Sequence, residues 1–557
     1  MTKNTARTST SQPSAPTSSG VDHCKETSTT DSSGGNIASQ KGEARLHGIG
    51  LALVIIAVYL SVFCVALDNT IIATAIPTIT DQFHSIEDVG WYGSAYLLCE
   101  AAFQLFFGKL YTVFDLKYIY LSAIVLFEIG SAVCASAPKS AAFILGRAIA
   151  GVGSAGIFSG ATLVIARGIP LSQRPIYIGT FGAMYGLASA AGPLIGGALT
   201  THVTWRWCFY INLPAGAVTV AFMMLIYKSK DTGQVDGHTQ QWKEKLVGLD
   251  YLGTAFFLPA IISLLLALQW GGTTYAWSSW RIILTLTFFG VLMTAFSLTQ
   301  WQKQDMGTVP PRILKRRSVS AAALFGFCIV GSMFSMVYYL PIWFQAIEGV
   351  DAMQSGIRSI ALVLSLVVAS MAAGVAVATV VGYYNPFMIA SSVLASVGAG
   401  MLCLLKVDSK AGVWIGYQIL YGIGIGFGMQ QSLMVVQTVL PDNEVPIGTA
   451  IINFSQTLGG ALSVSVASNL FDNRLVSELS KAVPDLDPSR LVIAGATKIR
   501  DLVPAESLPD VLQAYNAALV QTFRVPMALA ALSVLGALAV EWRSVRQDET
   551  SLLSEES

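Results

Sequence analysis

Among the ionisable side chains within the long apolar stretches of this 557-residue sequence, four are candidates for proton coupling. Three are the carboxylates Asp68, Glu100 and Glu128, and the fourth is Arg147. A carboxyl group in an apolar medium is harder to ionise than one in water, so its charge can switch in the range of physiological proton gradients. A nearby arginine stabilises the ionised form, and this effect changes as the two groups move together or apart. These residue types therefore favour the reversible binding of a proton.

Other titratable groups are less well placed for such chemistry. None of the five histidines falls near the middle of an apolar stretch; they are His23, His47, His84, His202 and His238. Six of the seven cysteines lie in apolar stretches without metal-ligand or redox spacing, and Cys24 lies in a polar tail. We expect no metal site and no cofactor. A structural hydrogen bond from Thr70 or from a neighbouring helix is the alternative role for Asp68, and a structural role is also open for Glu100 and Glu128.

Polar and aromatic side chains recur inside the apolar stretches and could line a cavity. Asn453 and Gln456 are three residues apart, so they share one face of a helix. Amides donate and accept hydrogen bonds without a fixed charge, and aromatic rings adapt to varied apolar shapes. The full set predicted to line the cavity is Gln104, Phe158, Tyr185, Tyr338, Tyr339, Trp343, Gln345, Gln430, Gln431, Asn453 and Gln456. Such a cavity would suit neutral or amphipathic, partly aromatic organic molecules, although each amide could instead bond a neighbouring helix.

Composition indicates what positions these residues. The chain is 53% hydrophobic and only 12% charged, against about 25% charged in typical soluble proteins. From residue 48 onward, apolar stretches of roughly 20 residues alternate with short polar breaks, and this is the length that a helix needs to cross a bilayer. We predict an all-α polytopic membrane protein with fourteen spans near 48–78, 91–113, 118–137, 141–168, 176–199, 207–227, 249–269, 281–301, 319–345, 356–382, 386–406, 412–438, 447–471 and 517–541.

The polar breaks suggest how the spans are grouped. Residues 1–46 are rich in Ser, Thr and Gly and predict a disordered cytoplasmic tail. We expect a six-helix bundle over 47–227, inner loops and two central spans over 228–318, and a second six-helix bundle over 319–541. The second bundle would include a long outer loop, 472–515, and residues 542–557 would form a cytoplasmic tail. Equal numbers of basic and acidic residues, 33 of each, argue against a nucleic-acid partner.

Basic residues predict the orientation. Loops on the side of the N-terminus carry thirteen Lys and Arg residues: Lys109, Lys117, Arg167, Arg174, Lys228, Lys230, Lys243, Lys245, Lys303, Arg312, Lys315, Arg316 and Arg317. The opposite loops carry five: Lys139, Arg206, Arg281, Lys406 and Lys410. By the positive-inside rule both termini are then cytoplasmic.

The fifth span is built from small residues. It reads Gly179-Thr-Phe-Gly-Ala-Met-Tyr-Gly-Leu-Ala-Ser-Ala-Ala-Gly-Pro-Leu-Ile-Gly-Gly197, with Pro193 in its interior. Small residues let another helix approach closely, and the proline removes a hydrogen bond and bends the span. A bent, closely packed helix suits a protein that changes shape in the membrane, and a rigid structural pair is the alternative.

Several motifs, in order, resemble those of the fourteen-span drug:proton antiporters of the major facilitator superfamily. They are Leu67-Asp-Asn-Thr-Ile-Ile-Ala-Thr-Ala-Ile-Pro77, Leu145-Gly-Arg-Ala-Ile-Ala-Gly-Val-Gly-Ser-Ala-Gly156, Gly192-Pro-Leu-Ile-Gly-Gly197, Trp205-Arg-Trp-Cys-Phe-Tyr-Ile-Asn-Leu-Pro214 and Tyr338-Tyr-Leu-Pro-Ile-Trp-Phe-Gln345. The resemblance covers roughly residues 48–541, and it is closest to fungal efflux pumps for toxins and other secondary metabolites. It implies the major facilitator fold, with Gly192, Pro193, Gly196 and Gly197 as a conformational motif.

One loop departs from the family pattern G-x-L-a-D-r-x-G-r-k. Here it reads Gly108-Lys-Leu-Tyr-Thr-Val-Phe-Asp-Leu-Lys117, with Thr112 in place of the aspartate and Asp115 in place of a glycine. The gating interactions that this loop supports in relatives could therefore be rearranged. Our hypothesis is that Asp115 supplies the missing acid.

The leading hypothesis is proton-coupled efflux of small organic molecules by alternating access, with Asp68 and Arg147 as the coupling pair and Glu100 and Glu128 as further candidates. The default location is the plasma membrane, with the vacuolar membrane as the alternative. Uptake or vacuolar transport of amino acids or another small solute is a second reading, but the later spans offer no carboxylates for basic substrates. A membrane enzyme would need a His/Asp/Cys cluster, which is absent from the sequence, and a sensor without transport activity also stays open. ATP is not expected as the energy source, because no Walker loop occurs.

Overall fold

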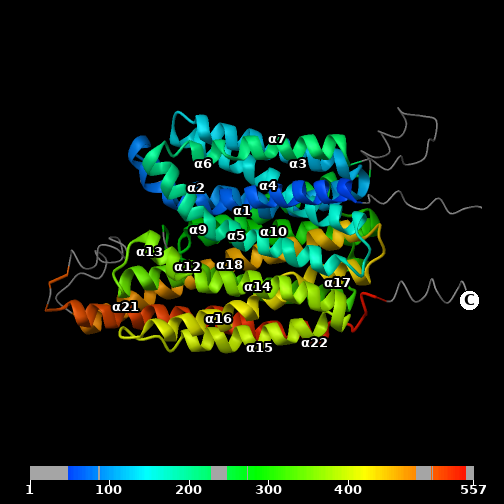
Figure 1. Ribbon diagram of the computed structural model, residues 1–557. Helices are drawn as coiled ribbons and strands as arrows, with labels where there is room; N and C mark the ends of the chain where they lie inside the picture. Colours follow the sequence, from blue (N-terminus) through cyan, green and yellow to red (C-terminus); the bar gives the residue numbers. More distant parts are fainter. Residues whose placement is uncertain are drawn as a thin grey trace, which may run out of the picture. The chain divides into compact units, whose positions relative to one another are not determined.

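The structure is a computed structural model that describes residues 48–85, 88–227, 248–272, 274–483, 503–504 and 506–546. All named regular elements in these ranges are helices (Figure 1). The helices of the first part are α1 (Ile49–Phe83), α2 (Val89–Val113), α3 (Leu116–Ser136), α4 (Ser140–Gly168), α5 (Arg174–His202), α6 (Trp207–Tyr210), α7 (Asn212–Leu225), α9 (Tyr251–Trp270) and α10 (Trp280–Lys303). The predicted tail 1–46 and most of the loop from Lys228 to Val247 lie outside the described residues.

The second part continues the pattern with several broken spans. Its elements are η2 (Gln304–Met306), α11 (Pro311–Leu314), α12 (Arg317–Ile347), α13 (Ala352–Arg358), α14 (Ile360–Ala376), η3 (Val377–Val381), α15 (Asn385–Leu402), α16 (Ala411–Gly428), α17 (Gln431–Val439), α18 (Val445–Ala482), α21 (Leu508–Thr522) and α22 (Arg524–Ala539).

The predicted all-α membrane fold is confirmed. Thirteen helical stretches among the described residues are long and apolar enough to cross a membrane. Helix α2 is not among them; it carries Glu100 and Lys109 and packs against α4 and α18, and we count it as the fourteenth span. The helix ends agree with the predicted spans to within several residues in most cases, because each polar break coincides with a turn between apolar helices.

The largest difference between the predicted spans and the observed helices lies near the C-terminus. Helix α18 continues to Ala482 and α21 begins at Leu508, so parts of the predicted outer loop 472–515 are helical, and the last span starts before residue 517. These extensions are stabilised by packing between the two helices, with the Phe471 and Tyr515 rings 5.5 Å apart and Leu475 and Leu479 buried. Hydropathy alone missed them because polar residues cover their outer faces.

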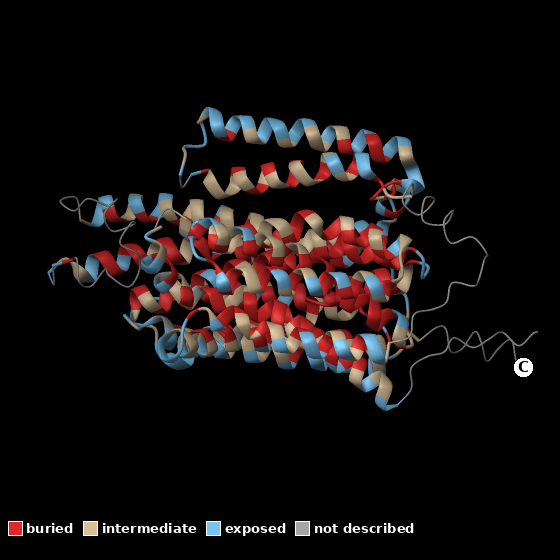
Figure 2. Ribbon diagram, turned by 90° about the horizontal axis from the view of Figure 1, so that it is seen from above, coloured by how far each residue is buried: buried red, intermediate tan, exposed pale blue. Residues whose placement is uncertain are grey.

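Small residues let neighbouring helices approach closely. Gly130 of α3 lies against the backbone of Ala150 on α4, where a Cβ would have no room. Helices α1 and α5 meet in the same way, with Gly192 against Thr70 and Gly196 against Ile71 and Thr74. The buried residues gather along the middle of the molecule, and the exposed ones lie at its periphery (Figure 2).

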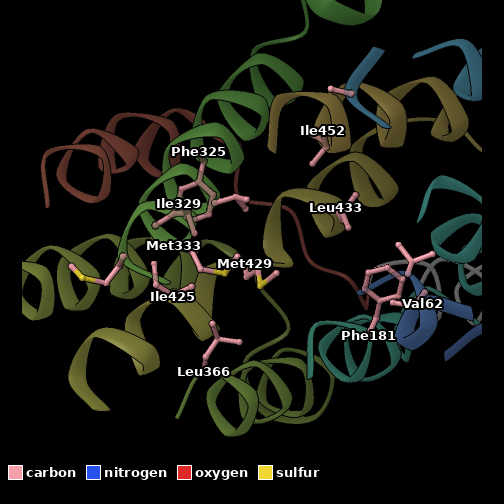
Figure 3. Close-up of a cluster of buried hydrophobic side chains, with 14 of the residues drawn as sticks. Val62, Phe181, Phe325, Ile329, Met333, Leu366, Ile425, Met429, Leu433 and Ile452 are labelled. Carbon is pink, nitrogen blue, oxygen red and sulfur yellow. The ribbon is translucent and has the colours of Figure 1, made fainter. Parts of the chain in front are cut away.

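Helices of the first part meet those of the second chiefly where α5 packs against α14 and α2 against α18, with smaller contacts of α4 with α18 and of α5 with α13 and α17. At the first, Gly179 lies against the backbone of Ser370 and Gly374 against that of Pro175. At the second, Gly108 lies against Ala450. Figure 3 shows Val62 of α1 and Phe181 of α5 across from Leu433 of α17, and all three belong to one apolar cluster. The contacts of Gly108, Gly179 and Gly374 lie towards the ends where α5 and α18 begin, whereas α5 also contacts α13, which follows the opposite end of α12.

The α9–α10 hairpin lies beside the junction of α2 and α18. It contacts α2 through the rings of Trp270 and Trp91, whose centroids are 6.0 Å apart. It contacts α18 through Phe257 and Phe454, 5.3 Å apart, and through a hydrogen bond of 2.9 Å from the Trp277 indole to Asn469. The predicted central pair, α9 and α10, is thus placed against both α2 and α18.

Candidate functional site

Asp68 and Arg147 form an ion pair inside the first part of the chain. Asp68 is on α1 and Arg147 on α4, and both side chains are 0% exposed. The guanidinium also donates through Nε to the Tyr92 carbonyl at 2.9 Å and lies 4.4 Å from the centre of the Tyr96 ring. A buried charge is tolerated only when a partner and hydrogen bonds replace its water, and this pair has both. The two residues predicted for proton coupling are therefore brought together.

A third residue completes the carboxylate's surroundings. Asn212, at the start of α7, donates from Nδ2 to Asp68 Oδ1 at 3.2 Å and to the Ser131 hydroxyl of α3 at 3.1 Å. The alternative partner Thr70 donates instead to the carbonyls of Ala66 and Leu67, at 3.0 and 3.2 Å. Sequence analysis did not single out Asn212, although it is the one amide in the motif 205–214 and lies in an otherwise apolar run.

The other two predicted carboxylates lie on neighbouring helices. Glu100 is on α2, one turn from Tyr96, and is only 7% exposed. Glu128 is on α3, close to Gly216 of α7, and its Oε2 is buried without a hydrogen-bond partner. Neither has an ion-pair partner among the described residues comparable to Arg147. Both are near enough to the pair to respond to its charge.

Four of the predicted cavity residues lie where the two parts of the chain meet, and a fifth, Gln456, is bonded within the second part. The Phe158 ring of α4 packs against Tyr185 of α5 at 5.9 Å, and next to it Ser159 accepts a hydrogen bond of 3.5 Å from Asn453 of α18. Gln430, between α16 and α17, lies beside Gly182 of α5, and Gln456 donates to the Met429 carbonyl at 3.1 Å. Gln104 of α2 and Gln431 of α17 are also buried, each with an unpaired Oε1.

The remaining cavity candidates lie on α12, away from this group. The Tyr339 ring packs against Tyr338 and Phe471, at 5.2 and 5.7 Å. Trp343 is fully buried and its indole donates to Asn516 of α21 at 2.8 Å. Tyr338 is 56% exposed, and Gln345 is half-buried. These contacts within the second part of the chain are the ones that fix α12 to α18 and α21.

The glycine motif of α5 packs against α1 close to Asp68. Gly192 touches Thr70 and Gly196 touches Thr74, whereas a side chain at Gly197 would meet nothing within 4 Å. Pro193 lies in the helix interior between them. A change in the bend of α5 would therefore shift the α1 segment that carries Asp68.

The loop with the atypical gating sequence has a different pattern of bonds. Asp115 caps α3 by accepting the Lys117 backbone N–H at 2.8 Å, and the Lys117 ammonium donates to the Met224 carbonyl at 2.9 Å. Thr112 donates to the Gly108 carbonyl at 3.0 Å. The nearby Lys109 donates to the carbonyls of Met306 and Gly307, both at 3.0 Å, in the linker that follows α10.

That linker is held by a buried carboxylate, Asp250, at the N-cap of α9. It accepts from Lys303 at 2.8 Å, from Gln300 at 2.6 Å and from the backbone of Gly253 and Thr308 at 2.9 and 3.0 Å. Burial alone would raise the pKa of Asp250, but these donors outweigh it and lower the pKa to about 2. A cavity of about 210 Å³ lies beside it, lined mainly by apolar side chains of α2 and α9.

The same linker reaches the second part of the chain. Arg312 of α11 bonds Glu444 at the N-cap of α18, and Arg316 lies 3.4 Å from the other oxygen of Glu444. Asp305 accepts from Arg312 at 3.1 Å. Lys109, the linker and Glu444 thus form a chain of contacts from α2 to α18. It was not predicted from the sequence, because Lys109 bonds backbone carbonyls and the carboxylates lie far along the chain from their partners.

Comparison with known sequences identifies the family. The Major Facilitator Superfamily matches residues 58–464. The chain is 54% identical over 513 residues to "MFS-type efflux pump MFS1" of Trichophyton rubrum, covering 92% of this chain and 95% of that protein. It is 51% identical over 515 residues to "Efflux pump aflT" of Aspergillus parasiticus, covering 92% and 100%. It is also 47% identical over 500 residues to the "Aspyridones efflux protein" of Neocamarosporium betae, covering 90% and 88%.

Solved structures share the fold. The human organic anion transporter MFSD10 matches with a TM-score of 0.56 at 13% identity, covering 86% of this chain and 99% of that one. The proton:xylose symporter XylE matches with a TM-score of 0.55 at 14% identity, covering 90% and 98%. The chain therefore belongs to the Major Facilitator Superfamily, among its fungal efflux pumps, and is a multi-pass membrane transporter rather than an enzyme.

Proposed function

We propose that this chain exports small organic molecules in exchange for protons by alternating access. The single observation that supports proton coupling best is the fully buried Asp68–Arg147 pair, which is the one ion pair with both side chains at 0% exposure among the described residues. A proton on Asp68 would cancel one charge of the pair and leave Arg147 free to find another acceptor. The nearby carboxylates Glu100 and Glu128 would respond to that change.

The contacts between the two parts of the chain support alternating access. We propose that residues 47–227 and 319–541 form two bundles that rock against each other. Gly108, Gly179 and Gly374 make close contacts between them at the ends that the positive-inside rule assigns to the cytoplasm. With that orientation, and both termini cytoplasmic, these contacts support the proposal of a state closed to the cytoplasm.

The energy needed for switching is within reach of such a site. Reversing a 1:99 preference between two states takes about 5.5 kcal/mol of differential binding. Each unit of change in the pKa of a group between the two states supplies about 1.4 kcal/mol. One carboxyl group could supply much of this, and the coupled network of Asp68, Arg147 and their neighbours would supply the rest.

The proposed substrates are toxins, drugs or secondary metabolites of modest polarity. The relatives named as efflux pumps support this class, and so do the uncharged cavity candidates Phe158, Tyr185, Gln430 and Asn453. We propose the plasma membrane as the location, and the proton gradient rather than ATP as the energy source.

The proposal is tested by transport into inside-out vesicles prepared from cells that overproduce the protein. We use Nile red, a neutral aromatic dye, as the probe. A pH gradient alone, acidic inside, should drive dye uptake, and a protonophore should stop it. Uptake that requires ATP and persists without a gradient would contradict the proposal. Vesicles from cells lacking the protein provide the background rate.

A further inference from the structure

Asn212 has an unpaired buried atom beside the proposed proton site. Its Nδ2 donates to Asp68 Oδ1 and to the Ser131 hydroxyl, at 3.2 and 3.1 Å, whereas its Oδ1 has no hydrogen-bond partner. All three side chains are 0% exposed. A buried polar atom without a partner is costly, so its presence in the site needs an explanation.

The amide offers what each protonation state of Asp68 requires. An ionised carboxylate accepts hydrogen bonds only, whereas a protonated carboxyl also carries an O–H that needs an acceptor. The amide supplies a donor from Nδ2 and an acceptor from Oδ1, and a half-turn of the amide group exchanges their positions. Ser131 can accept from Nδ2 or donate to Oδ1, because a hydroxyl does both.

We propose that Asn212 is a positioning residue for proton coupling, whose amide turns over when Asp68 gains or loses its proton. In the ionised state Nδ2 faces Asp68, as in this structure. In the protonated state Oδ1 accepts from the Asp68 O–H and from the Ser131 hydroxyl. One amide group is unpaired in either state, so the turn loses no hydrogen bond. This inference rests on the proposed proton coupling through Asp68.

The amide is neutral, so its half-turn moves no net charge. The charged and titratable groups around it affect the pH at which Asp68 titrates and the amide turns. The titratable or charged residues around Asp68 and Asn212 are Cys64 of α1, Tyr92, Tyr96 and Glu100 of α2, Glu128 and Cys134 of α3, Arg147 of α4, Tyr185 of α5 and Cys208 of α6. Arg147 holds the other carboxylate oxygen, and its Nη2 is also unpaired. Asn212 therefore acts on the one oxygen that Arg147 leaves.

Infrared difference spectroscopy of the purified protein in lipid tests this directly. Spectra at acidic and alkaline pH are compared for the wild type with and without isotope-labelled asparagine. The carboxyl band lost in Asp68→Asn identifies Asp68, and the labelled band lost in Asn212→Leu identifies the amide. We expect the Asn212 band to shift over the same pH range as Asp68 titrates.

The outcomes separate the two proposals. An Asp68 band that titrates beside an unchanged Asn212 band overturns the inference and leaves proton coupling intact. An Asp68 band that does not titrate overturns both. In Nile red transport, Asn212→Leu should lower the gradient-driven rate about tenfold, as expected for loss of a hydrogen bond to a charged group.

Two further variants keep the test decisive. Asn385 of α15 is a matched control: it is 0% exposed, donates to the carbonyls of Val540 and Glu541, and has an unpaired Oδ1, but no carboxylate is bonded to it. Asn385→Leu should lower stability without changing the pH profile of transport. Where Asn212→Leu does not fold, Ser131→Ala removes the second partner of the amide and should alter the position of the Asn212 band; an unaltered band would overturn the inference.

Discussion

The two halves of this transporter bury polar groups of different kinds. The first half buries a charged pair, Asp68 and Arg147, surrounded by donors and acceptors that face it. In the described part of the second half, Glu444 is the one charged residue that is buried; it precedes α18, and its carboxylate pairs with Arg312 and Arg316. The spans there bury amides and hydroxyls instead, of which Gln418 and Gln437 have neither amide atom paired. The difference suggests that proton binding belongs to the first half and that the second half adapts to varied substrates.

The largest effect is expected when the buried charged pair of the first half loses one partner. Arg147→Leu leaves Asp68 buried without its counter-charge, which typically costs about 3–5 kcal/mol of stability. We expect little folded protein, measured as the fraction that elutes as a monodisperse peak and as the midpoint of thermal unfolding in detergent.

Gln418→Met is the counterpart in the second half. Gln418 is 0% exposed with both amide atoms unpaired, so replacing it with an apolar side chain of similar size should be neutral or stabilising by about 1 kcal/mol. A large loss of stability in this variant would show that the second half also depends on a buried polar network.

The contact chain of Lys109, the linker and Glu444, on the side proposed to be cytoplasmic, should set the balance between states. Lys109→Ala removes two charge-assisted hydrogen bonds to the linker, worth about 1.5–3 kcal/mol, and should raise the population open to the cytoplasm about tenfold or more. Spin labels at the exposed positions Thr112→Cys and Asn443→Cys report this as a longer distance between the labels.

Lys117→Ala is the matched control for this measurement. Its ammonium bonds the Met224 carbonyl within the first half and makes no hydrogen bond or ion pair with the described part of the second half, so the distance distribution should stay that of the wild type. Equal distance distributions in the wild type, Lys109→Ala and Lys117→Ala would show that the linker contacts do not stabilise the closed state.

A smaller effect is expected where substrates would bind. Gln430→Leu removes an uncharged donor and acceptor beside Gly182 of α5. Export of compounds with hydrogen-bonding groups should weaken about tenfold relative to Nile red, corresponding to about 1–1.5 kcal/mol. The pH dependence should not change, and a change would place proton coupling in the second half as well.

The smallest effect concerns Asp250. Its pKa of about 2 in the folded protein lies below the ordinary value of about 3.9, so its ionised form stabilises the fold above that value and the gain is lost as pH falls towards 2. Asp250→Asn should lower stability by about 1 kcal/mol at neutral pH, allowing for screening by solvent. The difference between variant and wild type in thermal unfolding should shrink below about pH 4.

The sequence predicted the spans because the bilayer imposes one length on each apolar helix. It also identified Asp68 and Arg147 as candidates, because charges in apolar stretches are few and must be paired. Asn212 was harder to identify because an amide carries no such cost and resembles many structural amides. The contacts of Lys109 could not be predicted, because its acceptors are the backbone carbonyls of Met306 and Gly307, almost two hundred residues away.

The predicted cavity residues fall into two groups for the same reason. Phe158, Tyr185, Gln430 and Asn453 lie where the halves meet, whereas Tyr339 and Trp343 are engaged in packing α12 against α18 and α21. Residue type and helical face, read from the sequence, do not tell whether a side chain packs against the other half of the protein or against helices of the same half.

The central claim is that ionisation of Asp68 couples transport to protons, and its most direct test compares two modes of transport in the Asp68→Asn variant. In proteoliposomes at equal pH on both sides, exchange of labelled for unlabelled Nile red needs no net proton movement. The account predicts that the variant retains exchange and loses uptake driven by a pH gradient. Gradient-driven uptake by Asp68→Asn at the wild-type rate, with the wild-type pH profile, would contradict it.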